Sequence, residues 1–223
     1  MLQLSKNILV PGKTETKCFV KEVQILNKCQ LPGFHICTVV HSLIYTFNYL
    51  CVMNTNIAEF IPADFDDQSR VWIYQSSRLF SLGEAFELEK MMNQFLQGWN
   101  THGTPVKGYA NLLYGQFVVL MADETATYVS GCSTDSSVRL IKEIEEKFNV
   151  TMFDRQMLAF VIKDKIQLLP LQQIPYAVQN NFITPDTLYF NNLVATKADL
   201  LNNWLVPVKD SWVAKKFKLE TAE

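Results

Sequence analysis

The sequence predicts an α+β fold in which a single domain, residues 53–223, has a mixed or mainly antiparallel sheet with helices packed on one face. Three observations lead to this class. Short aromatic and β-branched runs alternate with longer segments of helical periodicity. Extended runs meet around Gly115 and again at Asp164–Lys165, as in β-hairpins. No internal repeat or low-complexity linker interrupts the pattern.

The first elements after residue 53 are predicted to be a strand, a long helix and a hairpin. Residues 71–76 (VWIYQS) have the composition of a buried strand. Ser81 and Glu84 have the spacing of a capping box, which marks the start of a helix. Apolar residues then recur at helical spacing over about five turns: Ala85, Leu88, Met92, Phe95, Leu96 and Trp99. We expect Gly103 to end this helix, and residues 108–114 and 116–122 to form the hairpin.

The remaining elements are shorter, apart from a second amphipathic helix. The inward residues of that helix are expected to be Val138, Ile141, Ile144 and Phe148. The predicted elements are, in order, a strand over 128–130, the second helix over about 135–148, a strand pair over 157–163 and 165–169, a helix over 175–181, a strand over 187–190, and a helix from the cap Thr196 to Asn203. Around these short elements, the chain from about residue 170 is expected to be irregular.

Residues 1–52 differ in composition from the rest of the chain. Basic residues outnumber acidic ones five to two there, and four of the five cysteines lie in this part. We interpret Met53 as the true start and residues 1–52 as a dispensable extension. A membrane anchor is the alternative, because residues 36–53 are uncharged and about long enough to span a bilayer. A packed extension is the third interpretation.

The overall composition excludes several classes of protein. The chain has a formal net charge of -2 and is 48% hydrophobic, which is typical of a globular domain and lacks the basic footprint of a nucleic-acid-binding protein. Only Cys132 follows residue 53, so the domain cannot form an internal disulfide, and we expect a cytoplasmic protein. The cysteines have no paired spacing typical of metal sites, so neither a metal nor another cofactor is predicted.

The segment Ser130–Ser137 (SGCSTDSS) is the first candidate site, because small polar residues lead into the second helix. The amino end of a helix favours an anion and lowers the pKa of a thiol. The segment could therefore hold a phosphate or carboxylate, with Ser130, Gly131, Ser133 and Ser136 as ligands and Arg78, Arg139 or Arg155 supplying positive charge. Alternatively, Cys132 is a nucleophile or redox thiol. In the third interpretation, Thr134 or Asp135 is simply an N-cap and Cys132 is a packed apolar residue.

His102 is the second candidate, because it is the one histidine after residue 53. Any imidazole base that activates Cys132 within the domain would have to be this residue, with Asp135 or Asp123 orienting it. The alternative is that His102 only satisfies carbonyl groups at the carboxyl end of the first helix.

Residues 117–124 (FVVLMADE) are the third candidate, because an apolar strand ending in Asp123 and Glu124 is found in nucleoside triphosphatases. Such a site also needs a glycine-rich G-x-x-x-x-G-K-[ST] loop to hold the phosphates. Residues 12–14 (GKT) match only the end of that loop, since Asn7 stands where its first glycine would be. We therefore expect no phosphoryl transfer.

Several motifs in order resemble a family of small bacterial proteins labelled "ABC transporter ATPase". The matching segments are residues 71–78 (VWIYQSSR), 99–103, 130–138, 153–155 (FDR), 183–186, 190–194 and 210–212. The resemblance covers about residues 68–217 and implies that members start near Met53. It implies no mechanism, and residues 53–223 contain neither a Walker A loop nor an LSGGQ-type motif.

Two classes of function follow from these candidates. The leading expectation is a soluble domain that binds a small or anionic ligand, with no nucleic-acid partner and no membrane contact unless residues 36–53 are an anchor. The alternative is a thiol-dependent enzyme that uses Cys132 and His102. A weaker alternative is an accessory protein of a transporter.

Overall fold

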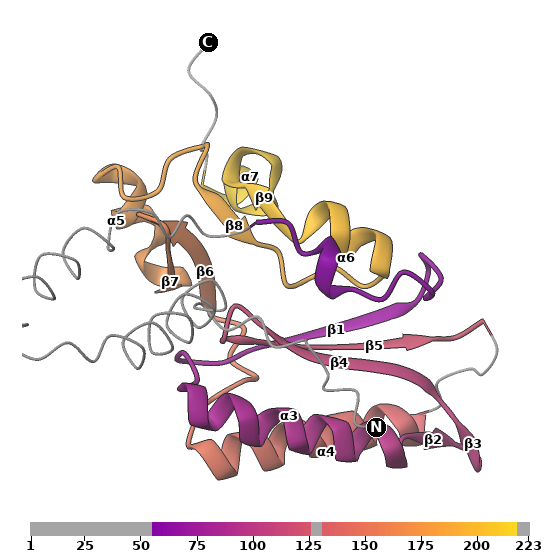
Figure 1. The fold of residues 1–223 in the computed structure, drawn as a ribbon. Helices are drawn as coiled ribbons and strands as arrows, with labels where there is room; N and C mark the ends of the chain where they lie inside the picture. The colour runs from indigo at the N-terminus through magenta and orange to yellow at the C-terminus, as the bar shows by residue number, and fades with distance from the viewer. Residues whose placement is uncertain (1–54, 126–130, 218–223) are drawn as a thin grey trace, which may run out of the picture. The chain divides into compact units, whose positions relative to one another are not determined.

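The computed structural model describes residues 55–125 and 131–217, so the predicted extension over 1–52 and the predicted strand over 128–130 lie outside the described residues. All strand pairs in the described part are antiparallel, which confirms the predicted α+β class (Figure 1). The strands form a three-stranded sheet, a two-stranded hairpin and a four-stranded sheet. In the described part of the chain, no helix combines the length and the apolar character needed to cross a membrane.

The three-stranded sheet has the order β1-β5-β4. Its strands are β1 (Arg70–Gln75), β4 (Lys107–Leu113) and β5 (Phe117–Asp123). Strands β4 and β5 form the predicted hairpin, in which Tyr114 and Gly115 adopt left-handed backbone conformations. Every residue of β5 is buried, as expected for the central strand of a sheet that is covered on both faces.

Helices α3 (Leu82–Gly98) and α4 (Gly131–Phe148) cover one face of this sheet (Figure 1). The apolar stripes read from the sequence meet there, with Leu88 and Met92 of α3 and Ile141 and Ile144 of α4 in one buried cluster. Each such side chain contributes about 1.5–3 kcal/mol when it is fully buried. The predicted capping box also forms, since the Ser81 hydroxyl accepts from the Glu84 amide and the Glu84 carboxylate accepts from the Ser81 amide.

Helix α3 ends at Gly98, not at Gly103 as predicted. Trp99 leaves the helix to pack its buried ring against Trp72 and Phe95. The chain then forms a short hairpin of β2 (Asn100–Thr101) and β3 (Thr104–Pro105), with His102 and Gly103 in left-handed conformations at its turn. The alternative that His102 caps the carboxyl end of the helix is therefore wrong.

Close packing around Trp99 also explains Gly108 on β4. A Cβ atom at Gly108 would lie 2.5 Å from the Trp99 ring, which is closer than real Cβ contacts come. Glycine at this position lets the strand pass directly beneath the indole.

Helix α4 begins at Gly131, four residues before the predicted start at Asp135. Thr134 and Asp135 therefore lie inside the helix, and the alternative that either is its N-cap is wrong. Ser137 is fully buried, and its hydroxyl donates to the carbonyl of Thr134, 2.7 Å away. This bond gives the buried hydroxyl a partner within the helix.

The four-stranded sheet has the order β7-β6-β8-β9 and contains the predicted strand pair. Its strands are β6 (Met157–Ile162), β7 (Lys165–Pro170), β8 (Leu188–Phe190) and β9 (Leu205–Pro207). The helices of this part are α5 (Ile174–Gln179), α6 (Lys197–Asn203) and α7 (Trp212–Phe217). The region after residue 170 is thus more regular than expected, and Thr196 caps α6 as predicted.

Residues from this C-terminal part pack against the second face of the three-stranded sheet. Tyr114 and Phe117 contact Phe190 and Trp204 through their rings, with centroids 4.6–5.7 Å apart. Beside this aromatic cluster, a chain of hydrogen bonds runs between the two sheets. The Trp204 indole donates to Asn192 at 3.0 Å, the Asn192 amide donates to Gln75 at 2.9 Å, and Gln75 donates to the carbonyl of Met157 at 3.1 Å.

Candidate functional site

Arg78 is held in place by protein groups at one end of the helix pair. Its guanidinium donates two hydrogen bonds to the Glu84 carboxylate, at 2.8 and 2.9 Å, and others to the carbonyls of Leu79 and Phe148. Phe148 is the last residue of the 18-residue helix α4. At about 1.5 Å per residue, Arg78 therefore lies roughly 26 Å from the amino end of α4. The predicted grouping of Arg78 with Ser130–Ser136 in one anion site is wrong.

The same ion pair makes part of the stability dependent on pH. The Arg78 guanidinium, followed by the Ser81 amide, lowers the pKa of Glu84 to about 2. Because the folded-state pKa is depressed, this contribution is complete above the pKa of the unfolded chain, about 4.3, and is lost as the pH falls toward 2. We expect Glu84→Gln to destabilise the protein at pH 6 and to have little effect at pH 2. Urea unfolding at both pH values measures this, and an equal loss at both would contradict it.

Arg155 is exposed in the segment between α4 and β6. Burial raises the pKa of the Tyr74 hydroxyl. A hydrogen bond with Ser137 and the positive charge of Arg155 lower this pKa, but by less. Arg155 does not line the groove in which two other predicted ligand residues meet.

Ser136 and Arg139 come together in a groove between α3 and α4. The groove has a volume of about 300 Å³. Helix α3 supplies Met91, Gln94, Phe95 and Gly98, and helix α4 supplies Ser136, Arg139, Leu140 and Glu143. The two sets follow helical spacing and run in opposite directions, because the helices lie antiparallel (Figure 1). Leu140 is buried and Phe95 half-buried, so the groove has an apolar floor.

Two charged groups of this groove are available for a ligand. Within the described residues, neither Arg139 nor Glu143 has a hydrogen-bonding or ion-pair partner, although they are four positions apart on one helix face. A guanidinium binds carboxylates and phosphates with two parallel hydrogen bonds. The Glu143 carboxylate nearby would accept from a hydroxyl or amino group. The groove therefore suits a molecule with one anionic group, one hydrogen-bond donor and an apolar body.

The predicted thiol site is only partly within the described residues. Ser130 and the side chains of Cys132 and Ser133 lie outside them, while Gly131 is the first residue of α4 and Asp135 is exposed on it. Strand β2 contacts α4, so the hairpin that bears His102 lies beside that helix. The Asp123 carboxylate, the other group predicted to orient His102, already has partners of its own. Hydrogen bonds from Thr125, followed by Lys107, lower the pKa of its carboxyl to about 2 and occupy it.

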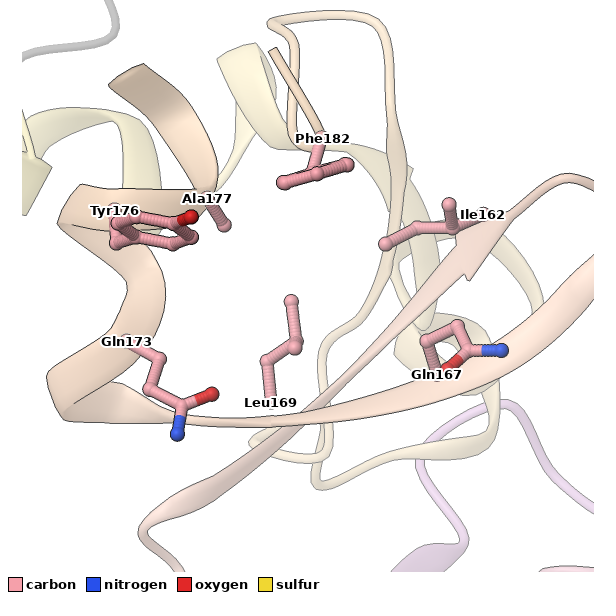
Figure 2. Close-up of a pocket in the computed structure, with 7 residues that line it drawn as sticks. All are labelled: Ile162, Gln167, Leu169, Gln173, Tyr176, Ala177 and Phe182. Atoms are coloured by element: carbon pink, nitrogen blue, oxygen red, sulfur yellow. The ribbon is translucent and has the colours of Figure 1, made fainter. Parts of the chain in front are cut away.

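A second cavity, which the sequence did not reveal, lies in the C-terminal part of the chain (Figure 2). It has a volume of about 310 Å³, and it is lined by Ile162, Gln167, Leu169, Gln173, Tyr176, Ala177 and Phe182. The local signal in the sequence is the pair of large aromatic residues, Tyr176 and Phe182, in a segment otherwise rich in amides.

Residues 55–125 and 131–217 contain no group of three or more histidine, cysteine or acidic side chains arranged to hold a metal ion. Comparisons of the chain with protein-family models, curated proteins and solved structures found no match.

Proposed function

We propose that this protein binds a small organic acid in the groove between α3 and α4. One observation carries the proposal: Ser136 and Arg139 meet above an apolar floor, and Arg139 has no acidic partner among the described residues. An arginine and a hydroxyl beside apolar side chains are usual elements of a carboxylate-binding site.

The other lining residues narrow the class of ligand. Glu143 repels a second negative charge, so compounds with several phosphates are disfavoured. Its carboxylate and the Gln94 amide instead suit a hydroxyl or amino group beside the acid. Met91, Phe95 and Leu140 would contact an apolar substituent. The preferred ligand is therefore a hydroxy or amino acid with an apolar or aromatic body.

The first test asks whether Arg139 binds the carboxylate of the ligand. We use 3-phenyllactate, which carries a carboxylate, a hydroxyl and a phenyl ring, and compare it with 2-phenylethanol, which lacks the acid. Arg139→Ala should weaken 3-phenyllactate binding about tenfold or more, because a charge-assisted hydrogen bond contributes about 1.5–3 kcal/mol. Isothermal titration measures this. Lys142→Ala removes a neighbouring exposed charge outside the groove and should leave the affinity unchanged.

A second pair of variants tests the space in the groove independently of the Arg139 charge. Gly98 lines the groove, and a Cβ atom built there meets no atom within 4 Å, so Gly98→Leu should occupy the space without disturbing the fold. Gly83 on the same helix has equally open surroundings but lies outside the groove, which makes Gly83→Leu the matched control. Binding that survives Gly98→Leu and Arg139→Ala would contradict the proposal.

Thiol chemistry at Cys132 is the second candidate, because the hairpin with His102 contacts α4. A thiol enzyme should have a Cys132 pKa below the reference of about 8.5 and should alkylate rapidly at neutral pH. His102→Asn should slow the reaction, and asparagine tolerates the left-handed conformation at this turn. Peptide mass spectrometry after iodoacetamide treatment measures Cys132 separately from the other cysteines. Slow alkylation that is insensitive to His102→Asn would exclude this chemistry.

A further inference from the structure

We propose that the cavity in Figure 2 is a second and independent binding site, which takes a small uncharged molecule with an apolar ring. Figure 2 shows the side chains of Tyr176, Phe182, Ile162 and Leu169 around an open centre. The cavity volume of about 310 Å³ lies at the lower end of the range for small-molecule sites.

The fold builds this cavity between a sheet face and a short helix. Gln167 and Leu169 are two residues apart on β7, so their side chains lie on the same face of the sheet. Ile162 of β6 lies on that face too. Helix α5 supplies Tyr176 and Ala177 across from that face. After α5, the amides of Phe182 and Ile183 both donate to the carbonyl of Ala177, which turns the chain back on itself. Ile183 is then buried in the core, while Phe182 lines the cavity.

The exposure of the two rings indicates a function beyond folding. Tyr176 is 65% exposed and Phe182 is 56% exposed, so neither ring contributes much buried area to the core. A single exposed apolar residue is ordinary on a protein surface, but these two line the same cavity. A ring placed between them would bury apolar surface on both, at about 25 cal/mol per Å².

The polarity of the lining determines the charge of the ligand. None of the described residues that line the cavity is acidic or basic. The side-chain amides of Gln167 and Gln173 have no hydrogen-bonding partner in the described part of the chain. They offer donors and acceptors to a neutral polar group, whereas an ion would lose its hydration without compensation. The site therefore differs in chemistry from the groove that contains Arg139.

The test uses N-phenyl-1-naphthylamine, an uncharged aromatic amine whose fluorescence increases in apolar surroundings. We expect saturable binding to the full chain, weakened at least fivefold by Tyr176→Ala and by Phe182→Ala. Because both rings are largely exposed, the urea midpoints of these variants should stay close to that of the parent protein. Phe86→Ala is the matched control, since Phe86 is 52% exposed on α3 and does not line the cavity. It should leave the affinity unchanged.

Three outcomes would overturn the inference. The first is that the probe does not bind, and the second is that it binds with equal affinity to the parent protein and to both cavity variants. The third is self-association of the chain that Tyr176→Ala abolishes in sedimentation experiments, which would make this face a contact between two copies. Arg139→Ala should not change the affinity for the probe, so failure here is distinguishable from failure of the α3–α4 groove.

Discussion

Replacing Trp204 by alanine should lower the free energy of unfolding by about 3–5 kcal/mol, a large fraction of the stability of an ordinary domain. Trp204 is completely buried. Its ring contacts Phe117 and Phe190 at centroid distances of 5.2 and 5.3 Å. Its indole also starts the chain of hydrogen bonds that reaches Gln75 and the carbonyl of Met157. The substitution therefore creates a cavity and removes a donor where the two sheets are joined.

Urea unfolding measures this effect, and Trp204→Phe serves as the comparison. Phenylalanine keeps an aromatic ring in the cluster but cannot donate to Asn192, so we expect a smaller loss of about 1–3 kcal/mol from the unsatisfied acceptor and the reduced volume. A loss below about 1 kcal/mol for Trp204→Ala would contradict the description of this cluster as a tightly packed contact between the sheets.

Lys197→Met should lower the free energy of unfolding by about 2 kcal/mol, which is the second large effect that we expect. The Lys197 side chain is buried at the start of α6, and its ammonium donates to the carbonyls of Ala63 and Phe65. Methionine preserves most of the apolar stem but leaves both carbonyls without this donor. Removing a buried charge also recovers desolvation energy, which limits the net loss.

Asp67→Asn is the matched control for Lys197. The ion pair between these residues is long, at 3.8 Å, and the Asp67 side chain is 75% exposed. Pairs of this kind contribute about 0–1 kcal/mol. Equal losses of unfolding free energy for Asp67→Asn and Lys197→Met would show that the charge pair, and not the two carbonyl contacts, holds residues 63–67 against α6.

The elements with strong local signals could be predicted from the sequence. The capping box at Ser81 and Glu84, the turns at Gly115 and near Asp164, and the cap at Thr196 all depend on residues close together in the chain. Strand β9 has no comparable signal. Strand β9 is three residues long and is defined by its pairing with β8, about 17 residues earlier.

The first turns of α4 were mispredicted because local propensity and tertiary packing disagree there. Serine, threonine and glycine favour a loop or a cap, which is why the segment before Asp135 was expected to be irregular. In the structure the helix nevertheless reaches Gly131, and Ser137 is buried in it with its hydroxyl bonded to the Thr134 carbonyl. Trp99 has the opposite effect on α3, because packing against Trp72 ends that helix early.

The neighbours of the candidate site residues could not be predicted from the sequence either. Ser136 and Arg139 stood out in the sequence, but their neighbours Met91 and Phe95 became apparent only when the antiparallel packing of α3 and α4 was known. The cavity with Tyr176 and Phe182 depends on the β6–β7 pair facing α5, a relation that no short segment encodes.

Chemical-shift mapping with 3-phenyllactate tests the proposed function most directly. In a titration of the ¹⁵N-labelled chain, we expect saturable shifts in the amides of residues 91–98 and 136–143, which lie on the two sides of the groove. Arg139→Ala should move the midpoint of these shifts to a ligand concentration about tenfold higher or more, and 2-phenylethanol should not reproduce them. Shifts confined to residues 162–182, or no saturable shifts at all, would contradict a ligand site between α3 and α4.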